Sequence, residues 1–213
     1  MRSRAEASVV IIVFAKAPLP GRVKTRLAPL IGSQGAARLQ ARLIRRALDT
    51  ARAADCGDVE LCCAPHRKYA FFERCGRLPG ISLTAQGGGD LGARMHRALA
   101  RGLRTHRAAI LIGADCPALR PGDLRIAARA LCDGVDAVFA PTEDGGYALV
   151  GASRMSKRLF ERVAWGTGSV MRETQRRLRT LGWHWRMLRR VWDVDRPEDY
   201  VRLMRSRLLL RSP

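Results

Sequence analysis

A short loop near the start of the chain, FAKAPLPGRVKTRLAP, gathers cations in a turn shaped by glycine and proline. Its candidate ligand-binding residues are Lys16, Arg22, Lys24, Thr25 and Arg26. Cations of this kind, together with loop N–H groups, can surround phosphate oxygens. The spacing is not that of a P-loop, because Val23 stands where a glycine should precede the lysine, and a Rossmann G-x-G-x-x-G is also missing. We therefore expect a phosphate-binding loop of another kind, with a merely solvated basic loop as the alternative.

A carboxylate follows a later apolar run, AAILIG, in the segment GADCPAL. If the run is a buried strand, Asp115 emerges at the edge of the sheet. A lone aspartate at this position could simply cap the next loop. A carboxylate that faces a cationic phosphate loop would instead be a natural ligand for Mg²⁺ or Mn²⁺ bridging to a diphosphate.

Two more carboxylates alternate late in the sequence, in VWDVDRPEDY. In an extended segment, Asp193 and Asp195 point to the same face. Pro197, Glu198 and Asp199 have the composition of a helix start, so capping explains these acids but not the pair before them. The pair therefore indicates a second contact to the same metal ion.

Two adjacent acids precede two glycines in TEDGGYALVG. Either Glu143 or Asp144 could act as a general base or orient a hydroxyl group. Gly145 and Gly146 allow the backbone to approach a ligand closely, and Tyr147 opens the next apolar run. A tight turn between two strands is an equally good interpretation, since Asp-Gly is a frequent hairpin signal.

Two weaker segments complete the candidate site. QGGGDLGARM supplies Gln86 and Arg94 to a nucleotide-binding rim, and WGTGSVMRET offers Trp165 to the substrate side. The histidines fall outside these segments, and no Ser/His/Asp order or H-x-x-H pattern indicates a hydrolase.

The elements that must position these side chains alternate between apolar runs of strand length and longer helical patterns. We predict strands over Ser8–Ala15, Asp58–Ala64, Ile81–Gln86, Ala108–Gly113, Val135–Ala140, Tyr147–Gly151 and Trp183–Val191. We predict helices over Ser33–Ala54, Lys68–Cys75, Asp90–His106, Pro121–Cys132, Val170–Leu181 and Pro197–Leu210. This alternation is typical of an α/β fold, with a largely parallel sheet and helices on its faces. Ligands in such sheets bind beyond the carboxyl ends of the strands, where the candidate segments fall.

The composition limits the class of protein further. The 213 residues suit one domain, and a hydrophobic share of 47% excludes a disordered chain. The formal net charge is +20, but its arginines are spread over every helical pattern. We therefore expect solvated basic helix faces that attract polyanions without specificity, and no specific nucleic acid partner.

Cysteine usage and hydropathy indicate where the protein works. The six cysteines include no C-x-x-C pair, so we expect reduced thiols and no zinc site. The apolar run over Ser8–Ala15 is too short to span a membrane, and its β-branched residues favour a strand over an export signal. We expect a cytoplasmic protein with no membrane span.

Five segments together resemble a known family, the GT-A-fold nucleotide-diphospho-sugar transferase-like proteins. This family is described as glycosyltransferases associated with radical-SAM proteins and arsenosugar biosynthesis, and was formerly a domain of unknown function. The segments are FAKAPLPGRVKTRLAP, QGGGDLGARM, GADCPAL, EDGGYALVG and DVDRPEDY, and the resemblance spans about Ser8 to Leu203. It implies a single-domain, Rossmann-like GT-A fold over residues 1–213, with a mostly parallel mixed sheet and helices on both faces.

The resemblance also implies roles for the matching residues. Those that would hold the nucleotide phosphates are Lys16, Arg22, Lys24 and Arg26. Those that would hold or adjoin a metal ion are Asp115, which stands in for the D-x-D motif of GT-A enzymes, Asp193 and Asp195. Those that would form the turn under the sugar or acceptor are Asp144, Gly145 and Gly146. The loop lacks the L-x-G-G-x-[ST]-x-R-M-G of guanylyl- and cytidylyltransferases, which favours glycosyl transfer.

The leading hypothesis is therefore a transferase that needs Mg²⁺ or Mn²⁺ and moves a sugar from a nucleotide-diphosphate donor to a small-molecule acceptor. An alternative is a nucleotidyltransferase that joins a nucleoside triphosphate, GTP or CTP, to a phosphorylated small molecule. A basic nucleic-acid-binding module is a lesser alternative, which predicts steeply salt-dependent binding with sequence discrimination.

Overall fold

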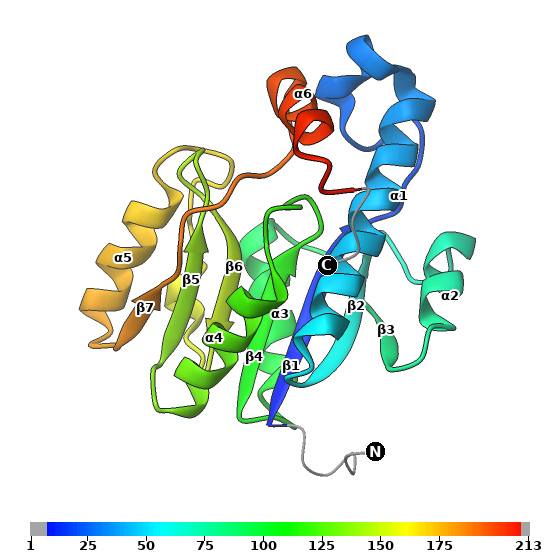
Figure 1. Ribbon diagram of the computed structural model, residues 1–213. Helices are drawn as coiled ribbons and strands as arrows, with labels where there is room; N and C mark the ends of the chain where they lie inside the picture. Colours follow the sequence, from blue (N-terminus) through cyan, green and yellow to red (C-terminus); the bar gives the residue numbers. More distant parts are fainter. Residues whose placement is uncertain (1–7, 210–213) are drawn as a thin grey trace.

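Seven strands form one sheet in the computed structural model, which describes residues 8–209 (Figure 1). In chain order they are β1 (Val9–Lys16), β2 (Asp58–Ala64), β3 (Ile81–Ala85), β4 (Ala108–Gly113), β5 (Ala137–Pro141), β6 (Tyr147–Ala152) and β7 (Trp185–Met187). Their order across the sheet is β3-β2-β1-β4-β6-β5-β7. All neighbours run parallel except β6, which is antiparallel to both β4 and β5. The predicted α/β fold with a mostly parallel mixed sheet is confirmed.

The register of the central strands brings the candidate segments to one edge. Lys16 at the end of β1 lies beside Ala64 of β2, and Phe14 lies beside Gly113 of β4. The strand β6 runs in the opposite direction, so its first residue, Tyr147, lies at this same edge. The β1–α1 loop, the segment after β4 and the β5–β6 turn therefore meet beyond the carboxyl ends of the parallel strands.

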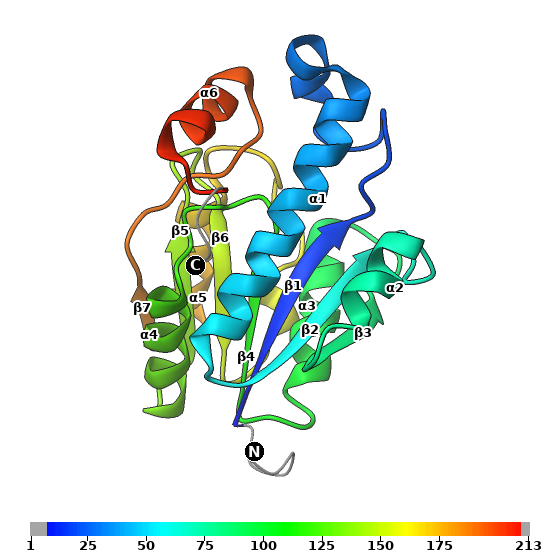
Figure 2. The ribbon, with the colours of Figure 1, turned by 45° about the vertical axis from the view of Figure 1, so that its right-hand side comes forward.

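Helices cover both faces of the sheet (Figure 2). On one face α1 (Ala28–Ala54), α2 (Ala70–Gly76) and α4 (Pro121–Cys132) pack over a core that includes Ile11, Val13 and Ile110. On the other face α3 (Leu91–Gly102) and α5 (Val170–Thr180) pack over Ile12 and Phe139. The strand β1 is buried on both faces because its run of β-branched residues lies between these two layers.

A third, smaller cluster lies above the edge that carries the candidate segments. It packs α6 (Pro197–Ser206) against the start of α1 and a short 3₁₀ helix, η1 (Thr25–Leu27). Its buried members are Leu27, Leu39, Leu43, Val194 and Leu203. In Figure 1 this cluster is where the blue first turns of α1 and the red α6 come together.

Most predicted boundaries agree with the structure to within two residues, and four differ by more. The helix predicted over Asp90–His106 ends at Gly102, after which the chain forms turns. The helix predicted from Ser33 begins at Ala28, and Gly32, with φ +70°, kinks it. The last strand covers only Trp185–Met187, since Arg189 turns away and donates to the Asp123 carboxylate of α4. The last helix ends at Ser206, and residue 210 of the predicted range lies outside the described residues. No helix among residues 8–209 has the length and apolar character needed to cross a membrane.

Candidate functional site

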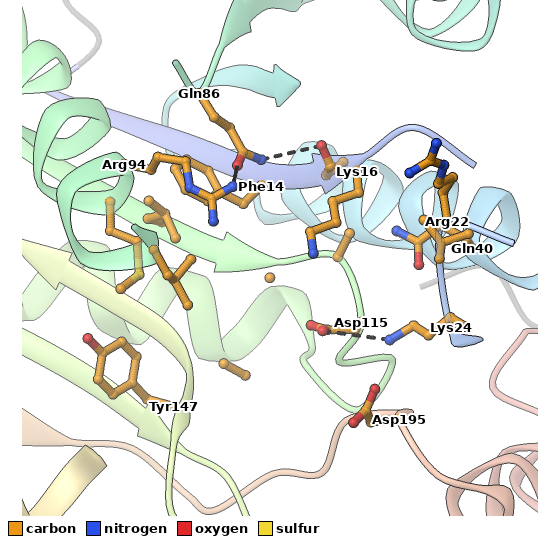
Figure 3. Close-up of a pocket in the computed structure, with 18 of the residues that line it drawn as sticks. Phe14, Lys16, Arg22, Lys24, Gln40, Gln86, Arg94, Asp115, Tyr147 and Asp195 are labelled. Carbon is orange, nitrogen blue, oxygen red and sulfur yellow. Dashed lines mark hydrogen bonds and ion pairs between the residues drawn. The ribbon is translucent and has the colours of Figure 1, made fainter. Parts of the chain in front are cut away.

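A cavity of about 580 Å³ opens at the carboxyl ends of β1 and β4 (Figure 3). All seven predicted nucleotide- or phosphate-binding residues line it: Lys16, Arg22, Lys24, Thr25, Arg26, Gln86 and Arg94. Three further predicted residues do so as well: Asp115, Tyr147 and Asp195. The structure therefore brings together, in one cleft, predicted residues from separate segments of the chain, the first at Lys16 and the last at Asp195.

The loop after β1 is held by its apolar residues, which leaves its polar side chains at the cleft. Ala17 continues the strand ladder by donating to the Ala64 carbonyl, at 2.8 Å. Val23 and Leu27 are buried and anchor the loop against the core. Gly21 has φ +72°, a left-handed conformation that glycine adopts without strain. Between these anchors Lys16, Arg22 and Arg26 are exposed at the cavity, as a site for a polyanion requires.

Lys24 and Asp115 form an ion pair across the cleft. The Lys24 ammonium lies 3.7 Å from the carboxylate of Asp115, and Figure 3 draws this contact as a dashed line. The Lys24 side chain is only 7% exposed, whereas that of Asp115 is 47% exposed. Lys24 also has φ +47°, which is uncommon for a residue with a side chain. The loop thus directs one ammonium toward the acid that follows β4.

The segment that carries Asp193 and Asp195 is hydrogen-bonded to the segment that carries Asp115. The Val194 N–H donates to the Asp115 carbonyl at 2.9 Å, and the Cys116 thiol donates to the Trp192 carbonyl at 3.1 Å. Val194 itself is fully buried, so Asp193 and Asp195 flank a fixed point of the chain. This arrangement agrees with the predicted proximity of Asp115 to the late acids.

The two late acids have different environments. Burial, followed by the negative charges of Asp115 and Asp144, raises the pKa of Asp193 to about 7, and the nearby Lys24 opposes this shift. Asp193 is therefore close enough to two other carboxylates for like-charge repulsion to favour its protonated form. Asp195 instead forms an ion pair with Arg26 of the cationic loop. A divalent cation between Asp115 and Asp193 would relieve the repulsion that Asp193 experiences.

The donor atoms fit an ion that shares its ligands with a bound phosphate. Within residues 8–209, no three side chains of the types His, Cys, Asp and Glu form a group that could hold a metal ion. Mg²⁺ in such sites is commonly held by one or two carboxylates, with water and substrate phosphates as further ligands. Asp115 lines the cavity and its charge acts on Asp193, so these two carboxylates are the candidates for such a pair.

Packing accounts for the glycines of the β5–β6 turn. Asp144 accepts hydrogen bonds from the Thr142 hydroxyl and from the Gly146 N–H, so it closes the hairpin turn. Gly145 has φ +88°, and a Cβ there would lie 2.2 Å from the Gly168 carbonyl oxygen. The close approach that we predicted for a ligand is in fact made by the backbone at Gly168. Gly145 and Gly146 therefore shape the turn and do not line the cavity.

Glu143 and Trp165, like Asp144 and Asp193, lie outside the cavity lining. Arg202 of α6 donates to both Glu143 carboxylate oxygens, at 2.7 and 3.1 Å, and these bonds lower the Glu143 pKa. A carboxylate held in this way is a weak proton acceptor. Trp165 packs edge-on against Tyr147, with 6.3 Å between ring centroids, and so supports the aromatic ring that does face the cavity.

Gln86 acts on the cleft through its neighbours. It is 4% exposed and donates to the carbonyls of Ala15, at 3.3 Å, and Cys62, at 3.0 Å. Its amide oxygen accepts from Arg94 at 3.2 Å. Gln86 thereby links β1, β2 and α3, and it orients the Arg94 guanidinium at the cavity.

Sequence reasoning missed one polar residue of the cleft, Gln40 of α1, which lies beside Arg22 in Figure 3. The available signal was a glutamine within an apolar helix face formed by Ala36, Ala37 and Leu43. The apolar wall of the cavity was also not predicted. Its members are Phe14, Leu91, Met95, Leu111, Ala148 and Val150.

Fold and cleft together define the class of the protein as a transferase with a GT-A-like fold. A crystal structure from Desulfovibrio desulfuricans G20, provisionally assigned as a nucleotide-diphospho-sugar transferase, matches with a TM-score of 0.85 and 28% identity. The match covers 94% of this chain and 88% of that one. The predicted resemblance and the predicted transferase class are thereby confirmed.

The chain belongs to the family described as "Uncharacterized protein conserved in bacteria (DUF2064)", whose model matches residues 47–167. A comparison with curated proteins gives no match.

More distant structures share the fold. Glucosyl-3-phosphoglycerate synthase from Mycobacterium tuberculosis, in complex with Mn²⁺, UDP and glucosyl-3-phosphoglycerate, matches with a TM-score of 0.55 and 12% identity. That match covers 97% of this chain and 78% of the synthase. CMP:2-keto-3-deoxy-manno-octonic acid synthetase, complexed with CTP, matches with a TM-score of 0.57 and 14% identity, over 94% and 99% of the two chains.

Proposed function

We propose that this protein is a metal-dependent glycosyltransferase that uses a nucleotide-diphosphate sugar as donor and a small molecule as acceptor. The observation that carries the proposal is the meeting of the cationic loop and Asp115 in one cavity, with Lys24 and Asp115 3.7 Å apart. A cleft with cations on one wall and a carboxylate opposite suits a diphosphate that is bound together with a divalent cation. The related structure from Desulfovibrio desulfuricans supports the choice of donor class.

In this proposal the cations stabilise the leaving group. Lys16, Arg22, Arg26 and Arg94 bind the diphosphate oxygens, and Thr25 adds a hydroxyl donor at the same wall. Asp115 and Asp193 would hold Mg²⁺ or Mn²⁺, with Asp195 kept near them by Arg26. When bound, the cation would neutralise charge on the departing diphosphate.

Asp144 is the residue that we assign to the acceptor. The effect of its charge on the pKa of Asp193 supports a position near the proposed metal ligands. Its hydrogen-bond donors, Thr142 and Gly146, are neutral, whereas Glu143 is paired with the charged Arg202. Asp144 would orient the acceptor hydroxyl and take its proton as the oxygen bonds to the sugar carbon. The bond from that carbon to the diphosphate breaks, and the nucleoside diphosphate leaves. Tyr147 lines the cavity nearby and would contact the sugar or acceptor.

Nucleotidyl transfer is the alternative function, and identifying the released product distinguishes it from glycosyl transfer. CMP:2-keto-3-deoxy-manno-octonic acid synthetase, whose structure contains CTP, has the same fold. A nucleotidyltransferase that uses a nucleoside triphosphate and a phosphorylated acceptor would release pyrophosphate, whereas a glycosyltransferase releases a nucleoside diphosphate. The absence of L-x-G-G-x-[ST]-x-R-M-G from the loop after β1 favours the glycosyltransferase.

The test begins with a thermal-shift screen of nucleoside triphosphates, nucleoside diphosphates and nucleotide sugars, each with and without Mn²⁺. A ligand that binds only the folded state raises the unfolding temperature by mass action. We expect nucleotide sugars with Mn²⁺ to give the largest shifts, and hydrolysis or transfer to release a nucleoside diphosphate. Selective stabilisation by a triphosphate, with pyrophosphate as product, would establish the alternative. No shift with any of these compounds would refute both.

A further inference from the structure

Gln40 is a buried polar residue with no hydrogen-bonding partner. It lies on α1 and is 6% exposed, and what remains accessible faces the cavity that it lines. Among the residues that the structure describes, no group forms a hydrogen bond with its carboxamide. Its amide atoms are not among the fully buried polar atoms that lack a partner, so they are open to the cavity, where a ligand or solvent can reach them.

The contrast with Gln86 shows what is unusual. Both glutamines line the same cavity, and both are almost completely buried. Gln86 uses its amide nitrogen and oxygen for bonds to two carbonyls and to Arg94. Gln40 has the same two donors and one acceptor oxygen and uses none of them within the protein. The hydrogen bonds of Gln86 therefore stabilise the fold, whereas the carboxamide of Gln40 makes no such bond among residues 8–209.

The position of Gln40 on its helix adds to this contrast. Ala36 and Ala37 precede it by one turn, and Leu43 and Ile44 follow it by one turn, and all four are buried. An apolar side chain would continue this face and pack without an unpaired amide. An exposed glutamine, Gln34, lies on the same helix and shows the more usual position for this residue type.

The surroundings of Gln40 indicate which ligand group it binds. Gln40 lines the same cavity as Arg22 and Lys24, and Figure 3 draws Gln40, Arg22 and Lys24 at the same end of it. Phosphate oxygens only accept hydrogen bonds, and the cations on this wall already suit them. The carboxamide oxygen needs a donor from the ligand, and its nitrogen needs an acceptor. A hydroxyl group supplies both.

We propose that Gln40 binds a sugar hydroxyl that adjoins the diphosphate of the ligand, and so contributes to the choice of ligand. This inference rests on the proposed function. The hydroxyl belongs either to the ribose of the nucleotide or to the transferred sugar, and both present the same chemistry to a carboxamide. The experiment below separates these two sources.

The first measurement asks whether Gln40 supports the fold. Gln40→Met keeps the length of the side chain and removes its hydrogen-bonding groups, and Gln34→Met is the exposed control on the same helix. We expect Gln40→Met to unfold at about the same temperature as the wild type, because the amide that is lost faces the cavity and has no hydrogen-bonding partner among residues 8–209. A clearly lower unfolding temperature without ligand would assign Gln40 to the fold and overturn the inference.

The second measurement compares ligands by isothermal titration calorimetry with Mn²⁺. The probes are UDP, GDP and ADP, the sugars UDP-glucose, GDP-mannose and ADP-glucose, and 2′-deoxy and 3′-deoxy forms of the diphosphate that binds. We expect Gln40→Met to bind the preferred nucleotide sugar about tenfold more weakly, while Gln34→Met binds it like the wild type. If the hydroxyl is on the transferred sugar, the affinity for the diphosphate alone stays unchanged. If it is on the ribose, that affinity falls too, and one deoxy form binds both proteins equally.

The outcomes separate this inference from the function on which it rests. Equal affinities of wild type and Gln40→Met for a nucleotide sugar that does bind would overturn the role of Gln40 and leave the proposed function standing. A wild-type protein that binds none of the nucleotide sugars would overturn the proposed function, and the inference with it.

Discussion

At the scale of single residues, the charge of Asp115 is the feature on which the proposed chemistry depends. Asp115→Asn keeps the shape of the side chain and removes the charge that would hold a cation. We expect transfer activity to fall by about 100-fold or more, in line with other losses of transition-state stabilisation. The side chain is 47% exposed, so its ion pair with Lys24 contributes only about 0–1 kcal/mol to folding. Product formation with Mn²⁺ and a thermal unfolding curve measure the two effects, and unchanged turnover would exclude Asp115 as a metal ligand.

Lys24 should compete with a divalent cation for the same carboxylate. Its ammonium is nearly buried and lies 3.7 Å from Asp115, where it supplies the positive charge that a metal ion would bring. Lys24→Met should therefore bind Mn²⁺ about tenfold more tightly in the absence of nucleotide, and bind a nucleoside diphosphate more weakly. Lys16→Met is the matched control, since Lys16 lines the cleft and forms no ion pair with a carboxylate among residues 8–209. Equal Mn²⁺ affinities for the two variants would contradict the competition.

Asp193 should make the stability of the free protein depend on pH. Its folded-state pKa of about 7 lies above the ordinary value of 3.8, so the folded state holds a proton that the unfolded state has lost. Stability therefore falls as the pH rises from about 4 to about 7, and is constant above that range. Between pH 5 and pH 8 we expect the wild type to lose about 2 kcal/mol relative to Asp193→Asn, as measured by urea unfolding. Parallel pH profiles for the two proteins would show that Asp193 titrates normally.

At the scale of elements, the β5–β6 turn depends on Gly145. Its φ of +88° disfavours any side chain, and the Gly168 backbone occupies the space that a Cβ would need. Gly145→Ala should lower the free energy of unfolding by about 2 kcal/mol or more. Gly88→Ala is the control, since a Cβ at Gly88 has no neighbour within 4 Å. Denaturant unfolding of both variants tests the difference, and equal stabilities would refute the packing explanation of this glycine.

The elements themselves could be predicted because each reflects a local pattern. The run before Asp115 is continuously apolar and buried, so its strand and the carboxylate at its end follow from the sequence. The partners of that carboxylate do not, because they depend on contacts between distant segments. Arg26 and Asp195 are 169 residues apart in the chain and form an ion pair. The close approach of Gly168 to Gly145 and the unpartnered amide of Gln40 likewise became visible only in three dimensions.

At the scale of the whole molecule, the net charge of +20 should attract any polyanion. Many of the arginines are exposed on helices, away from the cleft, and we expect weak binding to DNA or RNA that neither discriminates between sequences nor survives moderate salt. Fluorescence anisotropy with two unrelated oligonucleotides, at about 50 and about 200 mM salt, measures this. Tight binding of one sequence at the higher salt would support the nucleic-acid-binding alternative instead.

The small cluster of Leu27, Val194 and Leu203 joins the loop after β1 to the segment that carries Asp193 and Asp195. During synthesis on the ribosome, β1 and its loop emerge well before the acidic segment does. The sheet can assemble as far as β6 while the cleft still lacks one wall. Catalytic competence should therefore arise as a late and abrupt event of biosynthesis, when the residues up to 203 leave the exit tunnel.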